Sequence, residues 1–242
     1  MRRANFRIFT VTVAGLLIIF FSSCRKDDRD GYSLEPGTVS DVEGNTYQTV
    51  IIGSMEWMAE NLKTTRYNDG TPIKYPGKDN DQWENNRTGA YSWYQNDKDS
   101  YSDTYGALYN WHAVKTGRLC PAGWRVPTDD EWTEANRSLA ANAGGNLKDN
   151  TAAYWQGSNT DAINVAGFKA LPGGGRFSAP PGGSRVAVNG YFYYMGKSGR
   201  WWTATEHSSS EAWYRSVHSG SGSLYRGYNY KETGFSVRCV RD

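Results

Sequence analysis

Alternating apolar and polar positions mark the first element of the chain, over residues 39–53. The stretch VSDVEGNTYQTVIIG alternates on both sides of the turn Glu43-Gly44-Asn45, which is typical of two antiparallel strands joined by a tight turn. The segment 67–71, Tyr-Asn-Asp-Gly-Thr, has the composition of a second hairpin turn. We therefore predict that the folded part of the chain begins with β-hairpins.

Apolar residues recur at helical spacing between residues 129 and 143. The repeating positions are Trp132, Ala135, Leu139 and Ala143. Thr128 and Glu131 have the spacing of a capping box, so Thr128 is the predicted N-cap, and the pair Gly144-Gly145 predicts the end of the helix. Asp129 and Asp130 fall in the first turn, where their charges complement the helix dipole. As metal ligands they are disfavoured, because consecutive helical residues point in different directions.

A second helix is predicted over residues 104–114, TYGALYNWHAV, with Leu108 and Trp111, and also Tyr105 and His112, toward its buried side. Beyond residue 145 the chain reads as short strands separated by Gly, Pro and Ser, such as GRWWTATE. The expected class is α+β, loop-rich, with little regular helix. Because the aromatic fraction is 14% and the chain holds ten tryptophans, we expect Trp and Tyr to build much of the core.

The N-terminus has the pattern of a secretory signal over residues 1–23. Arginines precede about 14 mostly apolar residues, too few for a comfortable membrane span, and small residues precede Cys24. This arrangement resembles the lipobox of bacterial lipoproteins, which implies that Cys24 becomes the acylated first residue and anchors the protein to a membrane. An ordinary signal peptide with an incidental cysteine is the alternative.

Residues 24–38 are the predicted flexible tether. Their charged run, residues 25–30, resembles the short export signal of Bacteroidetes lipoproteins, which implies an outer-membrane lipoprotein exposed on the cell surface. An anchor facing the periplasm is the alternative. Removal of residues 1–23 removes three of the 27 basic residues, which leaves 24 against 25 acidic ones. Nucleic-acid binding therefore has no electrostatic support.

Cys120 and Cys239 remain in the mature chain, and an even pair in an exported protein predicts a disulfide. On the chain-entropy model, closing a loop of this length stabilises the fold by about 4 to 5 kcal/mol. The bond would hold the start of the 129–143 helix against the last strand.

Five ordered motifs carry a family resemblance: WMAENL (57–62), YGALYNW (105–111), CPAGWRVPTDDEW (120–132), GRWWTATE (199–206) and GFSVRCVRD (234–242). Together they resemble the Fibrobacter succinogenes major paralogous domain over residues 39–242. Members of that family are mostly secreted proteins and lipoproteins of undefined biochemical role, so the resemblance implies a location more than a reaction.

RVPTDDEW and the terminal GFSVRC also resemble elements of the formylglycine-generating enzymes. That resemblance implies a C-type-lectin-like fold with two helices, a small twisted, mostly antiparallel sheet, long loops, and N- and C-terminal strands close together. The copper site of those enzymes needs a closely spaced cysteine pair, and the matching segment AWYRSVHSGSGSLYRG has none. The histidines of the chain are His112, His207 and His218, and we assign no catalytic residue and no cofactor.

The residues proposed to bind a ligand are the aromatic ones Trp83, Tyr94, Trp155 and Trp213. Trp83 and Trp155, flanked by polar residues, are the expected exposed rings, whereas Trp93, Trp201 and Trp213 lie in strand-like segments that favour the core. In the strand YFYY, residues 191–194, only alternate side chains are expected to face outward.

Asp97, Asp99 and Asp103 offer closely spaced oxygens for calcium, although the glycine and the terminal glutamate of an EF-hand are missing and a solvated acidic loop is the alternative.

The interpretation that unites these patterns is a lipid-anchored, non-enzymatic cell-surface module that binds a polysaccharide or a surface protein. The alternatives are an enzyme on the same scaffold, either an oxidoreductase or a carbohydrate hydrolase, and a structural or adhesive subunit of a surface assembly. A binding module should show one aromatic patch, an enzyme converging titratable groups, and an assembly subunit a large apolar patch or an edge strand.

Overall fold

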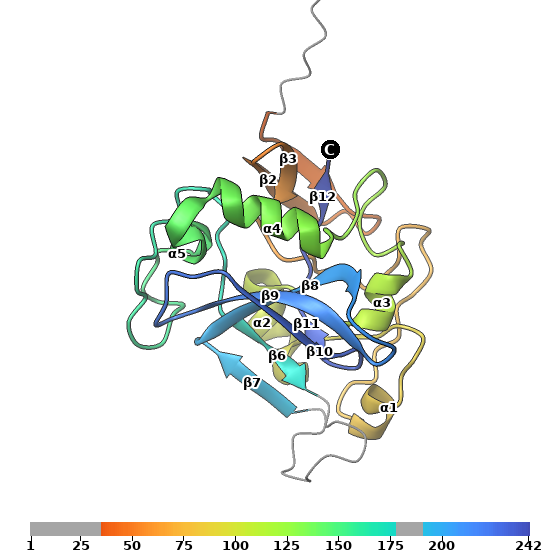
Figure 1. The fold of residues 1–242 in the computed structure, drawn as a ribbon. Coiled ribbons are helices and arrows are strands. Elements are labelled where there is room, and N and C mark those ends of the chain that lie inside the picture. The colour runs from red at the N-terminus through yellow and green to blue at the C-terminus, as the bar shows by residue number, and fades with distance from the viewer. Residues whose placement is uncertain (1–34, 178–190) are drawn as a thin grey trace, which may run out of the picture. The chain divides into compact units, whose positions relative to one another are not determined.

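The computed structural model describes residues 35–177 and 191–242, which belong to one compact unit, Leu34–Asp242 (Figure 1). The signal segment, Cys24 and most of the tether lie outside the described residues. The elements, in chain order, are β1 (Thr38–Ser40), β2 (Thr46–Ile52), β3 (Met55–Met58), α1 (Asn80–Glu84), β4 (Tyr91–Ser92), the 3-10 helix η1 (Tyr94–Asn96), α2 (Lys98–Tyr105), β5 (Leu108–Asn110), α3 (Trp111–Lys115), α4 (Asp129–Ser138), the 3-10 helix η2 (Ala140–Asn142), α5 (Ala143–Leu147), β6 (Gly173–Phe177), β7 (Tyr191–Met195), β8 (Ser198–Glu206), β9 (Glu211–His218), β10 (Tyr225–Tyr230), β11 (Gly234–Phe235) and β12 (Val240–Arg241).

The strands form three sheets, with the orders β1-β2-β3-β12, β10-β9-β8 and β4-β5-β11-β6-β7, and every pair of named strands is antiparallel. The fold is therefore mixed, with mostly antiparallel sheets and few helices, as expected. The last strand β12 pairs with β3, Val240 opposite Trp57, so the first and last strands share one sheet (Figure 1). This confirms the expected proximity of the terminal strands.

The first hairpin is confirmed, with β1 and β2 paired around residues 41–45. Asp41 builds its turn, because Oδ1 accepts hydrogen bonds from the amides of Glu43 and Asn45, each at 3.0 Å. Gly44 has φ +82°, a backbone conformation that glycine adopts without steric cost. The segment 67–71 also forms the predicted turn, closed by a hydrogen bond from the Tyr67 amide to the Thr71 carbonyl at 2.9 Å.

Helix α4 begins where the capping box predicts. The Thr128 hydroxyl accepts from the Glu131 amide at 3.3 Å, and the Glu131 carboxylate accepts from the Thr128 amide at 2.7 Å. The predicted end at residue 143 is wrong, since α4 stops at Ser138 and Gly144 and Gly145 lie inside α5. A Cβ on Gly144 would lie 2.2 Å from the Ser223 carbonyl oxygen, so the glycine pair allows close packing against the 221–223 loop and does not end a helix.

The helix predicted over residues 104–114 is also wrong. Gly106 ends α2 with φ +70°, and the chain then forms strand β5 before Asn110 caps the short helix α3 by accepting from the Ala113 amide at 3.1 Å. A side chain at position 106 would meet the Leu62 carbonyl oxygen at 2.8 Å. The described residues contain five short α-helices where two were expected. Gly106 separates α2 from β5, and Ala140, with φ +60°, lies between α4 and α5.

Tryptophan and tyrosine rings fill both core clusters, as the composition predicts. One cluster is centred on Trp132, whose ring meets Trp57 edge-on at a centroid distance of 4.7 Å and Phe168 at 5.8 Å. Trp93 and Trp201 are buried, which confirms their assignment to the core.

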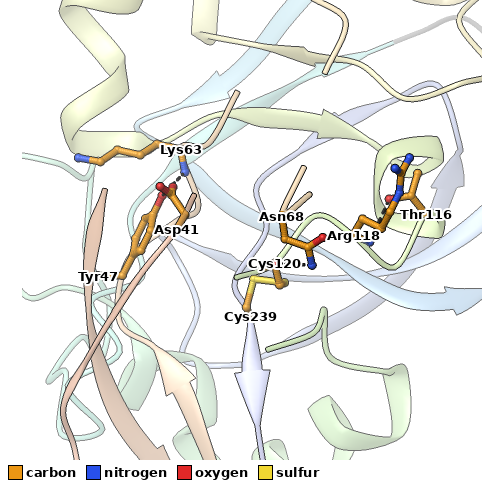
Figure 2. Close-up of a disulfide and its surroundings, with 8 residues drawn as sticks. All are labelled: Asp41, Tyr47, Lys63, Asn68, Thr116, Arg118, Cys120 and Cys239. Atoms are coloured by element: carbon orange, nitrogen blue, oxygen red, sulfur yellow. Dashed lines mark hydrogen bonds between the residues drawn. A yellow bond between two sulfur atoms is a disulfide. The ribbon is translucent and has the colours of Figure 1, made fainter. Parts of the chain in front are cut away.

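The predicted disulfide joins Cys120 to Cys239, with the Cα atoms 5.9 Å apart (Figure 2). Both cysteines are buried, and the Asn68 side-chain amide donates to the Cys120 carbonyl at 3.1 Å. The bond links the segment before α4 to the residue before β12, and it confirms the predicted connection. Among the described residues, no helix is long and apolar enough to cross a membrane.

Candidate ligand-binding groove

The structure separates the four aromatic residues proposed to bind a ligand. Trp83 and Trp155 have exposed fractions of 0% and 4%, so the expectation that their rings are exposed is wrong. Trp83 packs under the Arg176 guanidinium, 4.3 Å from its ring centroid, in space that Gly234 leaves free. Trp155 packs in the core beside the Lys148 ammonium, 5.4 Å away. The polar residues that flank them in sequence face the solvent, while the large apolar indole drives each ring inward.

Trp213 is partly exposed and lies on β9, in the β10-β9-β8 sheet. The Arg226 guanidinium stacks 3.4 Å from its ring centroid. His207 and Tyr228 complete this surface cluster, their rings stacked at 4.1 Å. The strand position of Trp213 therefore does not make it a core residue.

Tyr94 lies in an open groove of about 510 Å³, which we call the aromatic groove. The lining residues are Tyr94, Gln95, Tyr101, Gln156, Phe192, Tyr193, Tyr194, Met195 and Lys197. They come from η1, α2, the loop before β6, β7 and the turn after β7. Sequence reasoning placed Tyr94 among the ligand candidates, but it missed Tyr101, Gln95 and Gln156.

Strand β7 supplies the exposed tyrosines through an irregular backbone. In a regular strand successive side chains point to opposite faces, but Tyr194 has φ +69° and both Tyr193 and Tyr194 contact the Phe177 ring, at 6.0 and 5.6 Å. Gly174 on β6 allows this backbone, because a Cβ there would lie 2.2 Å from the Tyr193 carbonyl oxygen. The expected alternation along YFYY is therefore wrong, and Tyr191, Tyr193 and Tyr194 are all exposed.

The opposite wall of the groove is also conformationally strained. Gln95 and Asn96 in η1 have φ values of +54° and +57°, which non-glycine residues adopt at a cost of about 1 to 3 kcal/mol each. Arg176 supports this wall from beneath by donating to the side chains of Asn96 at 3.4 Å and Asn80 at 3.0 Å. Its guanidinium lies 5.3 Å from the Phe192 ring, and burial lowers the pKa of Arg176 to about 10, so it stays charged at neutral pH.

Arg200 supports the β7 wall in the same way. It is buried, and its guanidinium lies 4.4 Å from the Tyr194 ring and 5.4 Å from the Phe177 ring. Cation–π contacts of this kind contribute about 0.5 to 2 kcal/mol. Arg200 therefore holds Tyr194 from behind while the other side of the residue stays exposed.

Polar groups in the groove are amides and hydroxyls. Gln156 is exposed, and its backbone amide donates to the Gly196 carbonyl at 2.6 Å, which fixes the 156 loop against the turn after β7. Burial raises the pKa of Tyr94, so its hydroxyl stays protonated at neutral pH. The groove can therefore offer ring faces together with neutral hydrogen-bonding groups, and its lining includes one charged side chain, Lys197, and no carboxylate.

The three calcium candidates have separate roles. Asp97 caps α2 by accepting from the Ser100 amide at 3.1 Å, Asp99 is exposed in the first turn of α2, and Asp103 pairs with Lys63 at 3.7 Å. Across residues 35–177 and 191–242, no three or more His, Cys, Asp or Glu side chains gather in a way that could hold a metal ion.

The histidines are placed with different partners. His112 lies 3.4 Å from the Glu232 carboxylate, and His218 lies 3.1 Å from the Ser216 hydroxyl. Burial lowers the pKa of His218, and the positive charges of Arg200 and Lys148 lower it further.

A second hollow, of about 580 Å³, lies beside α1 and differs from the aromatic groove in chemistry. Its lining residues are Lys74, Asp79, Asp81, Gln82, Asn85, Asn86, Arg87 and Thr88. Asp79 caps α1 there, accepting from the Gln82 amide at 2.9 Å. The α1 hollow has no aromatic wall on which an apolar ligand face could stack, so the aromatic groove is the better candidate site.

The fold and the groove define a mixed α and β domain with mostly antiparallel sheets and one open aromatic site. The sequence model of the Fibrobacter succinogenes major domain matches residues 50–241, and the chain belongs to this family. A search of curated proteins and a search of solved structures each found no match.

Proposed function

We propose that this chain is a lipid-anchored cell-surface protein whose aromatic groove binds a glycan without transforming it. The observation that carries the proposal is the grouping of Tyr101, Tyr193 and Tyr194 around an open groove with the amides of Gln95 and Gln156. Sugar rings present apolar C–H faces and hydroxyl edges, and aromatic faces with neutral hydrogen-bonding groups complement both.

The strained backbone supports the same proposal. Two residues that line the groove, Gln95 and Tyr194, have positive φ values, and such strain persists where the surrounding structure enforces it, often at binding sites. Arg176 and Arg200, buried behind the two walls, fix the rings before any ligand arrives, which lowers the entropic cost of binding.

The finer fold assignment belongs to this proposal. A C-type-lectin-like arrangement is supported by the pairing of β12 with β3 and by the disulfide that ties Cys239, beside β12, to the segment before α4. The proposed binding mode needs no calcium, since the groove lining contains no carboxylate.

A glycan array and a polysaccharide pull-down test the groove, with the full chain in detergent and with or without calcium. Tyr101→Ala and Tyr193→Ala should each weaken binding by about tenfold, because a stacked ring contributes roughly 0.5 to 1.5 kcal/mol and tenfold corresponds to 1.4 kcal/mol. Tyr225→Ala and Tyr228→Ala are matched controls, since these exposed tyrosines lie on β10 outside the groove lining. Absence of any glycan binding would reject the proposal in favour of a protein partner or an assembly role.

The proposed lipid anchor at Cys24 can be tested separately from the groove. Substitution Cys24→Ser should abolish incorporation of a radiolabelled fatty acid and release the protein from the membrane fraction. Protease treatment of intact cells then distinguishes the proposed outer face of the outer membrane from a periplasmic anchor, where the protein would be protected. Continued labelling of the Cys24→Ser chain would contradict lipidation at this residue.

A further inference from the structure

Aromatic rings continue beyond the groove in an unbroken series. Centroid distances join Phe192 to Tyr94 at 5.2 Å, Tyr94 to Tyr101 at 5.2 Å, Tyr101 to Tyr105 at 6.1 Å and Tyr105 to Tyr154 at 6.3 Å. We call these five rings the aromatic row. Four of them are partly exposed, and Tyr94 is the buried one.

Helix α2 produces the middle of the row. Tyr101 and Tyr105 are four residues apart and therefore lie on the same face of the helix. Tyr105 is the last residue of α2, and its ring lies 3.6 Å from the position of a Cβ on Gly173, so this end of α2 packs against β6. Tyr154 lies in the same loop as Gln156, at the far end of the row.

The spacing of the rings is close to the length of one pyranose unit in a linear polysaccharide. Successive interplanar angles are 60°, 58°, 45° and 84°, so the rings share no common plane. A flat crystalline surface cannot contact such a row, whereas a single chain can turn along it and place sugar faces on the four partly exposed rings. The groove is open at the end of the row that Phe192, Tyr94 and Tyr101 form, which leaves room for the chain to continue there.

The charges of the groove lining restrict the class of ligand further. The groove lining carries Lys197 at an exposed position and no acid, and the remaining lining groups are uncharged. Recognition therefore depends on stacking and hydrogen bonds, which a neutral sugar chain satisfies without an unpaired charge.

We infer that the aromatic row is a series of subsites for the interior of a neutral, linear polysaccharide chain. This inference rests on the proposed function and deepens it by naming the ligand class. Tyr101 serves the central subsite, and Tyr105 and Tyr154 serve subsites that only longer chains reach.

The test is calorimetric titration of the full chain in detergent with cello- and manno-oligosaccharides of increasing length, from the single sugar to the hexasaccharide. For at least one series, affinity should rise by about tenfold or more between the disaccharide and the tetrasaccharide, the gain expected from one further stacked ring. It should then level off once the chain covers the row.

Variants locate the subsites. Tyr154→Ala should remove the gain of the longer chains and leave the disaccharide affinity unchanged, whereas Tyr101→Ala should weaken every length. Tyr105→Phe and Tyr154→Phe keep the rings and should retain the length dependence.

Glycan binding that is independent of chain length, or insensitive to both Tyr105→Ala and Tyr154→Ala, would overturn the row and leave the groove proposal intact. Array binding of branched or terminal sugars with no binding of either linear series would also overturn it. If neither the array nor the titrations show binding, the proposed function itself fails.

Discussion

The region around α4 and the aromatic groove obtain their geometry in different ways. At α4 the helix start is fixed by residues that are neighbours in the sequence, through the reciprocal hydrogen bonds of Thr128 and Glu131. At the groove, Gln95 and Tyr194 hold positive φ values that only their neighbours enforce. Local signals thus build the scaffold, and tertiary contacts impose the shape of the groove.

The two regions also differ in how they use charge. Asp129 at the start of α4 is buried and accepts hydrogen bonds from Arg215 at 2.7 Å and from Arg226 at 2.8 Å, which ties the helix to β9 and β10. Behind the groove, Arg176 and Arg200 contact aromatic rings and neutral groups. The first arrangement stabilises the fold, whereas the second orients rings that face solvent. Substitutions in the α4 region should therefore alter stability, and substitutions in the groove should alter binding.

The disulfide should give the largest stability effect. Cys120→Ser, Cys239→Ser and the double variant should each lower the free energy of unfolding by about 4 to 5 kcal/mol on the chain-entropy model, with equal losses because one bond is removed in every case. Urea unfolding measures the losses. Clearly additive single losses would show that the cysteines act independently, and a loss of glycan affinity in the folded variants would contradict the separation of scaffold from groove.

The ion pairs of Asp129 should come next. Asp129→Ala leaves Arg215 buried without its carboxylate and should cost about 3 to 5 kcal/mol in thermal or urea unfolding. Asp130→Ala is the matched control, because Asp130 also lies in the first turn of α4 but is exposed, and a charge near the helix dipole contributes about 0.3 to 1 kcal/mol. Equal losses in the two variants would show that the contacts with Arg215 and Arg226 do not stabilise the fold.

The sequence predicted features that depend on neighbours in the chain or on exported cysteines. The turn at Gly44, the cap at Thr128 and the bond between Cys120 and Cys239 all follow from residue type and spacing, and the structure confirms them. The family was likewise recognised from motifs in their order along the chain.

Burial and groove shape could not be predicted in this way. Trp83 is covered by Arg176, which lies far along the chain on β6. The polar residues beside Trp83 in the sequence therefore led to a wrong prediction that its ring is exposed. The four-residue spacing of Tyr101 and Tyr105 indicates that the two rings share one face of a helix. Nothing in the sequence places that face beside β7. The positive φ of Tyr194 depends on Gly174 across the sheet, and no local pattern reveals it.

The smallest effect on stability is expected at Tyr194. A substitution there also tests most directly the contrast between the α4 region and the aromatic groove. Tyr194→Gly should relieve a left-handed backbone cost of about 1 to 2 kcal/mol. It also removes the ring contact with Arg200, of about 0.5 to 2 kcal/mol. Because these terms oppose each other, the free energy of unfolding should change by no more than about 1.5 kcal/mol. Glycan affinity should fall by about tenfold, as for one lost stacking contact.

Tyr193→Gly is the matched control for this prediction. Tyr193 is exposed to a similar degree, 39% against 48%, lines the same groove and has no positive φ. Glycine at position 193 therefore costs roughly 0.5 to 1 kcal/mol in the strand with no strain to relieve, and this variant should lose both affinity and stability. If Tyr194→Gly proved no more stable in urea unfolding than Tyr194→Ala, which loses the same ring but keeps a side chain at this left-handed φ, the backbone at Tyr194 would carry no cost. The backbone of the groove would then be no more strained than that of the α4 region. Backbone strain would no longer support a binding role for this site.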